Sequence, residues 1–140
     1  MITAYRIDTA AEEIVSRSNK NFDGYLCFAV DFAGAEIYRC NHPEGVIAKC
    51  TIDIAADEIA TQDELDETFC EVYGLEDISE DTMFGCGGLA FERAEDSRTR
   101  RALMARGFSA VQYEDGVDTR ITETVMLLVP AAVTAVEVEE

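Results

Sequence analysis

Basic side chains are scarce in this chain of 140 residues: eleven Lys and Arg stand against twenty-nine Asp and Glu, which gives a formal charge of −18. This charge repels nucleic-acid phosphate and anionic membrane surfaces, so no direct binding to nucleic acid is expected. A basic protein stays open as a partner, because a groove built to hold nucleic acid also attracts an acidic protein. In most proteins, such acidity simply maintains solubility.

The chain also lacks the patterns of metal-binding, redox and membrane proteins. Its five cysteines lie apart with no C-x-x-C pair, and the single histidine, His42, has no second histidine with which to share a metal. We therefore predict no metal site and place His42 in a loop, within the turn-like NHPEG. No apolar run approaches the roughly 20 residues that span a bilayer. The acidic start, MITAYRIDTAAEE, is unlike a signal peptide, so a cytosolic location is predicted.

A dinucleotide-binding fingerprint is missing as well. The stretch DTMFGCGGLAF contains Gly85, Gly87 and Gly88, but not the G-x-G-x-x-G spacing between a strand and a helix that such a fingerprint requires. We predict a loop for this stretch.

Hydrophobic periodicity predicts a single α+β domain over residues 1–140, with compact mixed or antiparallel β-sheets and short helices. Thr9 with Glu12, and Thr61 with Glu64, have the spacing of capping boxes at helix starts. The stretch EDGVD predicts a turn between two closing strands. Strands are expected at 2–7, 25–31, 46–54, 108–114, 121–129 and, at a sheet edge, 133–139, and helices at 9–18, 32–39, 61–74 and 95–106.

The order of these elements resembles the ADP-ribosyltransferase fold. The resemblance is carried by the first strand with Y-R, the strand DGYLCFA, a strand near 46–54, a helix ending in Arg-Gly-Phe, and the closing VQYED and VMLLVP. The most specific stretch, ARGFSAVQYEDGVDTRITETVMLLVPAAVTAVE, resembles the final third of the small phage anti-CRISPR ADP-ribosyltransferases that inactivate type I-F surveillance complexes. The other two thirds agree in the order of elements rather than residue by residue.

This resemblance implies NAD as the co-substrate and a carboxylate as the catalytic group. Breaking the bond between nicotinamide and ribose builds positive charge on the ribose, which a nearby carboxylate stabilises. Asp115, with Glu114 beside it, matches the essential acid of the anti-CRISPR family. Glu123 matches the usual catalytic glutamate of the wider fold and is the second choice. From the residues alone, two acids in a turn are equally consistent with ordinary turn chemistry.

The first strand of this fold carries an Arg or His that holds the ribose or phosphate of NAD, and Arg6, next to Tyr5, stands at that position. A guanidinium forks onto phosphate or ribose oxygens, although a lone arginine in a strand is more often a surface charge. The glycine that usually follows is Ile7 in this chain.

The second strand would lie beneath the nicotinamide. Ala29 stands where the family commonly has a serine or threonine. Phe28, Phe32 and Tyr38 are candidates to stack on a ring of NAD, and aromatic residues at such spacings are also common in protein cores.

Three functions are consistent with the sequence. The first is an NAD-dependent mono-ADP-ribosyltransferase that modifies a protein in the cytosol of a host bacterium, with the basic DNA-binding surface of a CRISPR surveillance complex as its target. The second is an acidic binding protein that mimics nucleic acid without chemistry. The third is a toxin-like transferase with another target. The acidic segment 53–81, with twelve acids and no base, and the arginines at 93–106 are open both to docking and to simple solvation.

Overall fold

The computed structural model describes residues 1–85, 88–117 and 120–138. Its centre is one seven-stranded mixed sheet with the strand order β4-β5-β6-β2-β1-β3-β7. All neighbouring strands are antiparallel except β4 and β5, which are parallel. The strands are β1 (Ile2–Asp8), β2 (Cys27–Ala29), β3 (Val46–Ile52), β4 (Ile59–Ala60), β5 (Ala110–Val117), β6 (Arg120–Leu127) and β7 (Val133–Glu137).

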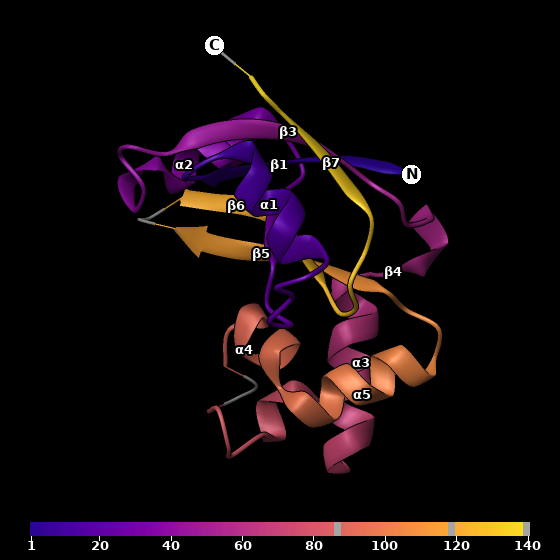
Figure 1. Cartoon of the computed structure of the whole chain (residues 1–140). Helices are drawn as coiled ribbons and strands as arrows, with labels where there is room; N and C mark the ends of the chain where they lie inside the picture. The colour runs from indigo at the N-terminus through magenta and orange to yellow at the C-terminus, as the bar shows by residue number, and fades with distance from the viewer. Residues whose placement is uncertain (86–87, 118–119, 139–140) are drawn as a thin grey trace.

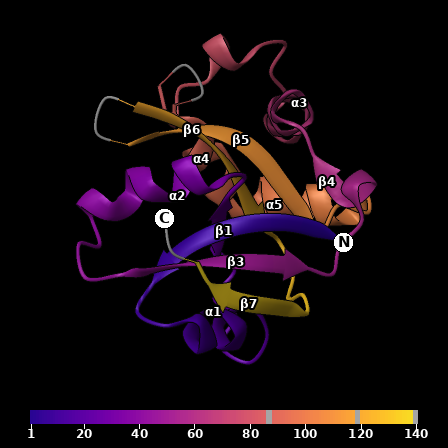
Figure 2. The same cartoon turned by 90° about the horizontal axis from the view of Figure 1, so that it is seen from above.

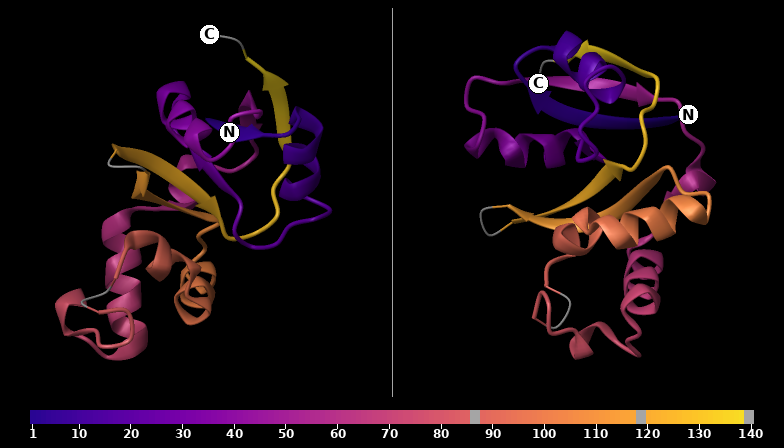
Figure 3. Two further views of the ribbon diagram at one scale, coloured as in Figure 1. Left: turned by 90° about the vertical axis from the view of Figure 1, so that its left-hand side faces the viewer. Right: turned by 60° about the horizontal axis from the view of Figure 1, so that its bottom comes forward.

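Short helices cover the two ends of this sheet, so the predicted α+β class is confirmed. The first helix packs beside β1, β3 and β7, and the second packs against β1, β2, β3 and β6 in the middle of the sheet. The third and fourth helices pack against β5, and the fifth packs against both of them (Figures 1 and 3). The helices are α1 (Ala11–Ser18), α2 (Phe32–Ile37), α3 (Gln62–Tyr73), α4 (Ala90–Glu95) and α5 (Ser97–Ala105), with 3-10 turns η1 (Tyr38–Cys40), η2 (Ala56–Glu58) and η3 (Ile78–Glu80).

The sheet is loosely joined at its middle. β1 pairs with β2 only at Tyr5 opposite Ala29, whereas it pairs with β3 along its whole length. One apolar cluster nevertheless spans the sheet, from Ile14 of α1 through β1 and β3 to Val125 and Leu127 of β6. Leu65 of α3 and Leu103 of α5 belong to a second cluster, on the other face of β5 and β6. The opening between β1 and β2 is where the candidate site lies.

Two predictions about helices needed correction. Thr9 does not cap the first helix: the N-cap is Ala10, and the Asp8 carboxylate accepts the backbone N–H of Thr9 at 2.8 Å instead. The helix predicted at 95–106 is present as α5 but begins two residues later, because the extended backbone of Asp96 separates it from α4, which was not predicted. The Asp96 side chain accepts the N–H of Thr99 at 3.0 Å and starts α5 as its N-cap. α4 also takes in Ala90 from the predicted loop, where Gly87 lies outside the described residues.

The turn predicted at EDGVD is not formed by residues 114–117, which belong to β5, and Asp118 lies outside the described residues. β5 and β6 pair from Ala110 opposite Leu127 as far as Val117 opposite Arg120. Glu114 and Asp115 are therefore strand residues, opposite Glu123 and Thr122. Acids and glycine are uncommon in strands, but the antiparallel ladder continues through Glu114, Asp115 and Gly116, and Gly116 pairs with Ile121 on the neighbouring strand.

Other expected elements are present with shifted ends. The capping box of α3 is confirmed, with the Glu64 N–H donating to Thr61 Oγ1 at 3.2 Å and the Thr61 N–H donating to Glu64 Oε1 at 3.1 Å. α3 ends at Gly74, whose φ of 68° is the left-handed conformation that glycine favours. The second strand is shorter than the predicted 25–31, and the helix predicted at 32–39 consists of α2 followed by η1. β4 was not predicted.

Candidate active site

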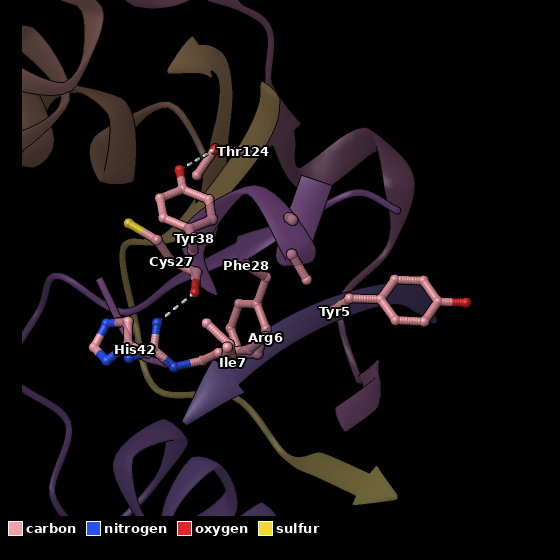
Figure 4. A pocket seen from close by; sticks show the side chains of 10 residues that line it. Tyr5, Arg6, Ile7, Cys27, Phe28, Tyr38, His42 and Thr124 are labelled. Carbon is pink, nitrogen blue, oxygen red and sulfur yellow. Dashed lines mark hydrogen bonds between the residues drawn. The ribbon is translucent and has the colours of Figure 1, made fainter. Parts of the chain in front are cut away.

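A pocket lies where β1 and β2 diverge (Figure 4). Its volume is about 70 Å³, and its polar wall is formed by Arg6 from β1, Cys27 from β2, Tyr38 from η1, Thr124 from β6 and His42 from the following loop. The loose pairing of β1 with β2 leaves this space open, because a full ladder would bring the two strands together along their length.

Tyr38 connects this pocket to Asp115. The Tyr38 hydroxyl donates a hydrogen bond to Asp115 Oδ2 at 2.6 Å and lies 3.2 Å from Thr124 Oγ1. Burial raises the pKa of the Tyr38 hydroxyl, and the bond to Asp115 raises it further. Tyr38 therefore keeps its proton at neutral pH and holds the Asp115 carboxylate in one orientation.

The close packing of α2 places Tyr38. Asp31 caps α2 by accepting the N–H of Gly34 at 2.7 Å. A Cβ atom added to Gly34 would lie 2.3 Å from Thr122 Oγ1 and 3.1 Å from the Ala29 Cβ, so only glycine lets the helix approach β2 and β6 so closely. η1 continues directly from α2 and carries Tyr38 to the edge of the pocket.

Arg6 forms another wall of the pocket and is held at two points. Its Nη1 donates to the Cys27 carbonyl oxygen at 2.7 Å, and its Nε donates to Asp8 Oδ2 at 3.2 Å. Arg17 donates to the same Asp8 oxygen at 3.1 Å. Burial alone would raise the pKa of the Asp8 carboxyl, but the Thr9 N–H and the two guanidinium groups outweigh burial and lower it. The Arg6 guanidinium is consequently held in the pocket wall, which His42 also lines (Figure 4).

The Cys27 thiol faces the hydroxyl of Tyr113, with Sγ 3.6 Å from the oxygen. Burial raises the pKa of Cys27 and outweighs the lowering by Tyr113. A thiol that keeps its proton is a poor nucleophile, so Cys27 contributes shape rather than covalent chemistry. Within the described ranges, no group of three or more His, Cys, Asp or Glu side chains is placed to hold a metal ion.

The three predicted catalytic acids fall on two faces of the β5–β6 hairpin. Successive residues of a strand point to opposite faces, and directly opposed residues share one. Asp115, opposite Thr122, faces Tyr38 and the pocket. Glu114 and Glu123 oppose each other on the other face, where Glu123 Oε2 accepts Gln112 Nε2 at 3.2 Å. The structure thus joins Asp115 to the pocket and separates the two glutamates from it.

The predicted NAD-binding aromatic residues are also divided. Tyr5 points away from the pocket (Figure 4), and its ring meets the edge of Phe32 at a centroid distance of 6.1 Å. Phe28 and Ala29 line the pocket wall but are nearly inaccessible to solvent, with exposed fractions of 1% and 3%. Tyr38 is the one of the three candidate stacking residues with a polar group at the site.

Sequence reasoning missed Cys27, His42 and Thr124 as lining residues. Thr124 carried a usable signal, because it is a hydroxyl residue in the middle of an apolar strand and is only 1% exposed. His42 was correctly predicted to lie in a loop, and nothing in NHPEG shows that this loop borders the pocket.

Comparisons with known proteins do not identify a family for this chain. No protein-family model, curated protein or solved structure matches the chain. Among the residues that the structure describes, no helix has the length and apolar character needed to cross a membrane.

Proposed function

We propose that this chain is an NAD-dependent mono-ADP-ribosyltransferase that modifies a protein. The observation that carries the proposal is the arrangement of Asp115, Tyr38 and Arg6 at one opening of the sheet. The resemblance in the sequence nominates Asp115 for the reacting ribose and Arg6 for the ribose or phosphate oxygens of NAD. These residues are 109 positions apart in the chain; Arg6 lines the pocket, and Asp115 is hydrogen-bonded to Tyr38, which lines it too.

The chemistry assigned to each residue follows from its contacts. NAD, when bound, supplies a glycosidic bond whose cleavage leaves positive charge on the ribose carbon. Asp115 provides a carboxylate to stabilise that charge, and Tyr38 fixes the carboxylate through Oδ2. Arg6 Nη2 has no hydrogen-bond partner among the described residues, so it is available to an anionic oxygen.

The pocket fits one end of NAD rather than the whole molecule. Its 70 Å³ is well below the roughly 300–1,000 Å³ of a typical small-molecule site. The larger part of the dinucleotide would therefore lie on the open surface outside. We expect the nicotinamide end to enter, because that end carries the bond that must lie near Asp115.

Ile7 and Ala29 depart from the family pattern, and each of them packs closely against a glycine. Ile7 replaces the usual glycine, and a Cβ atom on Gly45 would lie 2.7 Å from Ile7 Cγ1, so Gly45 provides the space that Ile7 fills. Ala29 replaces a hydroxyl residue and lies against Gly34, where α2 approaches most closely. Both changes are accommodated by local packing, and neither closes the pocket.

The proposed target is a protein with a basic surface. The resemblance suggests the DNA-reading part of a type I-F CRISPR surveillance complex, where a modification would block recognition of DNA. A formal charge of −18 supports attraction to such a surface.

The test is the intact mass of each subunit of a type I-F surveillance complex after incubation with the protein and NAD. The expected result is the addition of one ADP-ribose to one subunit, lost with Asp115→Asn and kept with Asp53→Asn, which removes an exposed carboxylate that does not line the pocket. Tight binding without a change in mass would favour the acidic nucleic-acid mimic. Modification of other cellular proteins but not of the complex would favour the toxin-like transferase.

A further inference from the structure

A second groove lies on the face of the sheet that carries Glu123. Its volume is about 610 Å³. Val30 and Ile59 supply apolar surface, Val125 lies buried at its floor, and Thr61, Gln112 and Glu123 supply polar groups. The start of β1 borders it on one side and η2 with β4 on the other, and both views in Figures 1 and 2 place these segments on the same side of the molecule.

An unfavourable pair of charges borders this groove. Glu114 and Glu123 are directly opposed in the β5–β6 ladder, and like charges in that position repel. No Lys or Arg of the described residues forms an ion pair with either carboxylate. Gln112 Nε2 gives Glu123 one hydrogen bond, and Gln62 Oε1 accepts the backbone N–H of Glu114 at 3.0 Å. These contacts leave both negative charges uncompensated.

The acidic surface of α3 is different in this respect. Asp66 is paired with Arg93 at 2.8 Å, and Glu71 is paired with Arg106. Arginines of the same chain therefore already occupy part of that surface. The Glu114–Glu123 pair combines two carboxylates, an adjoining groove and the lack of an internal cation.

We propose that this groove binds an arginine or lysine side chain presented by an extended segment of a protein partner. The long aliphatic stem of such a side chain would cover Val30, whose backbone N–H donates to the Glu123 carbonyl oxygen, while its charged end lies between Glu123 and the opposed Glu114. A nucleic acid or an anionic lipid would instead be repelled by these carboxylates.

This role is separate from the proposed transfer of ADP-ribose. The groove lies on the opposite face of β5 and β6 from Asp115, so the side chain held there is an anchor and not the acceptor of the reaction. The assignment does not depend on NAD and can be tested without it.

The test is an NMR titration of the full chain, without NAD, with a short acetylated and amidated peptide that contains one arginine among glycines and serines. A second peptide has citrulline in place of the arginine, which keeps the shape and removes the charge. We expect the arginine peptide to shift the amide signals of Thr61, Gln112 and Val125, and the citrulline peptide to bind about tenfold more weakly. Equal binding of the two peptides, or shifts confined to other surfaces, would overturn the assignment.

The matched variants are Glu114→Gln/Glu123→Gln and Glu67→Gln/Glu76→Gln, which make the same change of charge in the groove and on the acidic surface around α3. The groove variant should weaken peptide binding at least about fivefold and the α3 variant less than about twofold. Equal weakening would show general attraction by net charge and contradict a specific site. Because the substitution removes a repulsion, Glu114→Gln should have a Tm equal to or above that of the unmodified chain, which separates lost binding from lost folding.

Discussion

The Tyr38→Phe substitution tests the contact that joins Asp115 to the pocket. It removes the hydroxyl that donates to Asp115 Oδ2 at 2.6 Å and keeps the ring, so no cavity forms. A hydrogen bond to a charged acceptor contributes about 1.5–3 kcal/mol, and we expect the lower end because Asp115 is partly exposed and water can replace part of the bond. At neutral pH, the free energy of unfolding should therefore fall by roughly 1.5 kcal/mol.

The same substitution has a second signature in alkali. Burial and the Asp115 contact raise the pKa of Tyr38 in the folded chain, whereas the unfolded chain has the ordinary value of about 10. Above about pH 10, the unfolded chain releases a proton that the folded chain keeps, so stability falls as pH rises. Each such tyrosine contributes about 1.4 kcal/mol per pH unit to the decline, and Tyr113, whose pKa burial also raises, contributes in the same direction. Tyr38→Phe should remove one of these contributions.

Urea denaturation followed by circular dichroism measures both effects, at about pH 7 and in steps from about pH 9 to pH 11. Tyr5→Phe is the control at neutral pH, because its hydroxyl has no hydrogen bond among the described residues and points away from the pocket (Figure 4). We expect that control to change stability by less than about 0.5 kcal/mol. If Tyr38→Phe were as stable as the unmodified chain at neutral pH and declined as steeply in alkali, the proposed anchoring of Asp115 would be refuted.

Three further predictions concern the surroundings of the pocket. Gly34→Ala should lower Tm. The added Cβ atom would lie 2.3 Å from Thr122 Oγ1, and this overpacking costs about 1–3 kcal/mol, which outweighs the gain of about 1 kcal/mol in helix propensity. A raised Tm would show that α2 can move away from Thr122. Asp8→Asn should flatten the loss of stability in acid, because the lowered pKa of Asp8 gives a contribution that is present above about pH 4 and disappears as pH falls through the folded value. The difference in unfolding free energy between the two chains should therefore shrink as pH falls from about 7 to 3, and a difference that stays constant would contradict this role of Asp8. Arg6→Lys should weaken NAD binding in calorimetric titration because the planar fork is lost, and Arg6→Ala should weaken it further, by about 1.5–3 kcal/mol; equal affinities would remove Arg6 from the site.

The sequence was most informative where one local signal determines an element. The Thr61–Glu64 capping box and Gly74 defined α3 almost to the residue, because capping and the left-handed terminus act within a single turn. The start of α5 at Asp96 was missed although Asp followed by Ser is typical of an N-cap, because the prediction began the helix at Glu95, which is the last residue of α4. β4 has two residues and exists through its parallel pairing with β5, so no local pattern predicts it.

The site was partly predictable. Arg6 and Asp115 were nominated by resemblance; Arg6 lines the pocket, and Asp115 contacts it through the hydroxyl of Tyr38. The role of Tyr38 as a hydrogen-bond donor was not predictable, because it depends on how closely α2 approaches β2 and β6. That distance is set by Gly34, and a sequence does not state what lies opposite a glycine.

The division of the acids follows from one fact, which is that β5 continues through Glu114 and Asp115. If these residues formed a turn, both carboxylates would be free to face the pocket. In a paired strand they must point to opposite faces, and the antiparallel register places Glu123 with Glu114 rather than with Asp115. Under the two proposals, a target is anchored by a basic side chain at Glu114 and Glu123, on one face of β5 and β6, and is modified beside Asp115, on the opposite face. The anchoring residue and the modified residue must therefore lie on different segments of that target, so variants at 114 and 123 should change its affinity while variants at 115 change the transfer step.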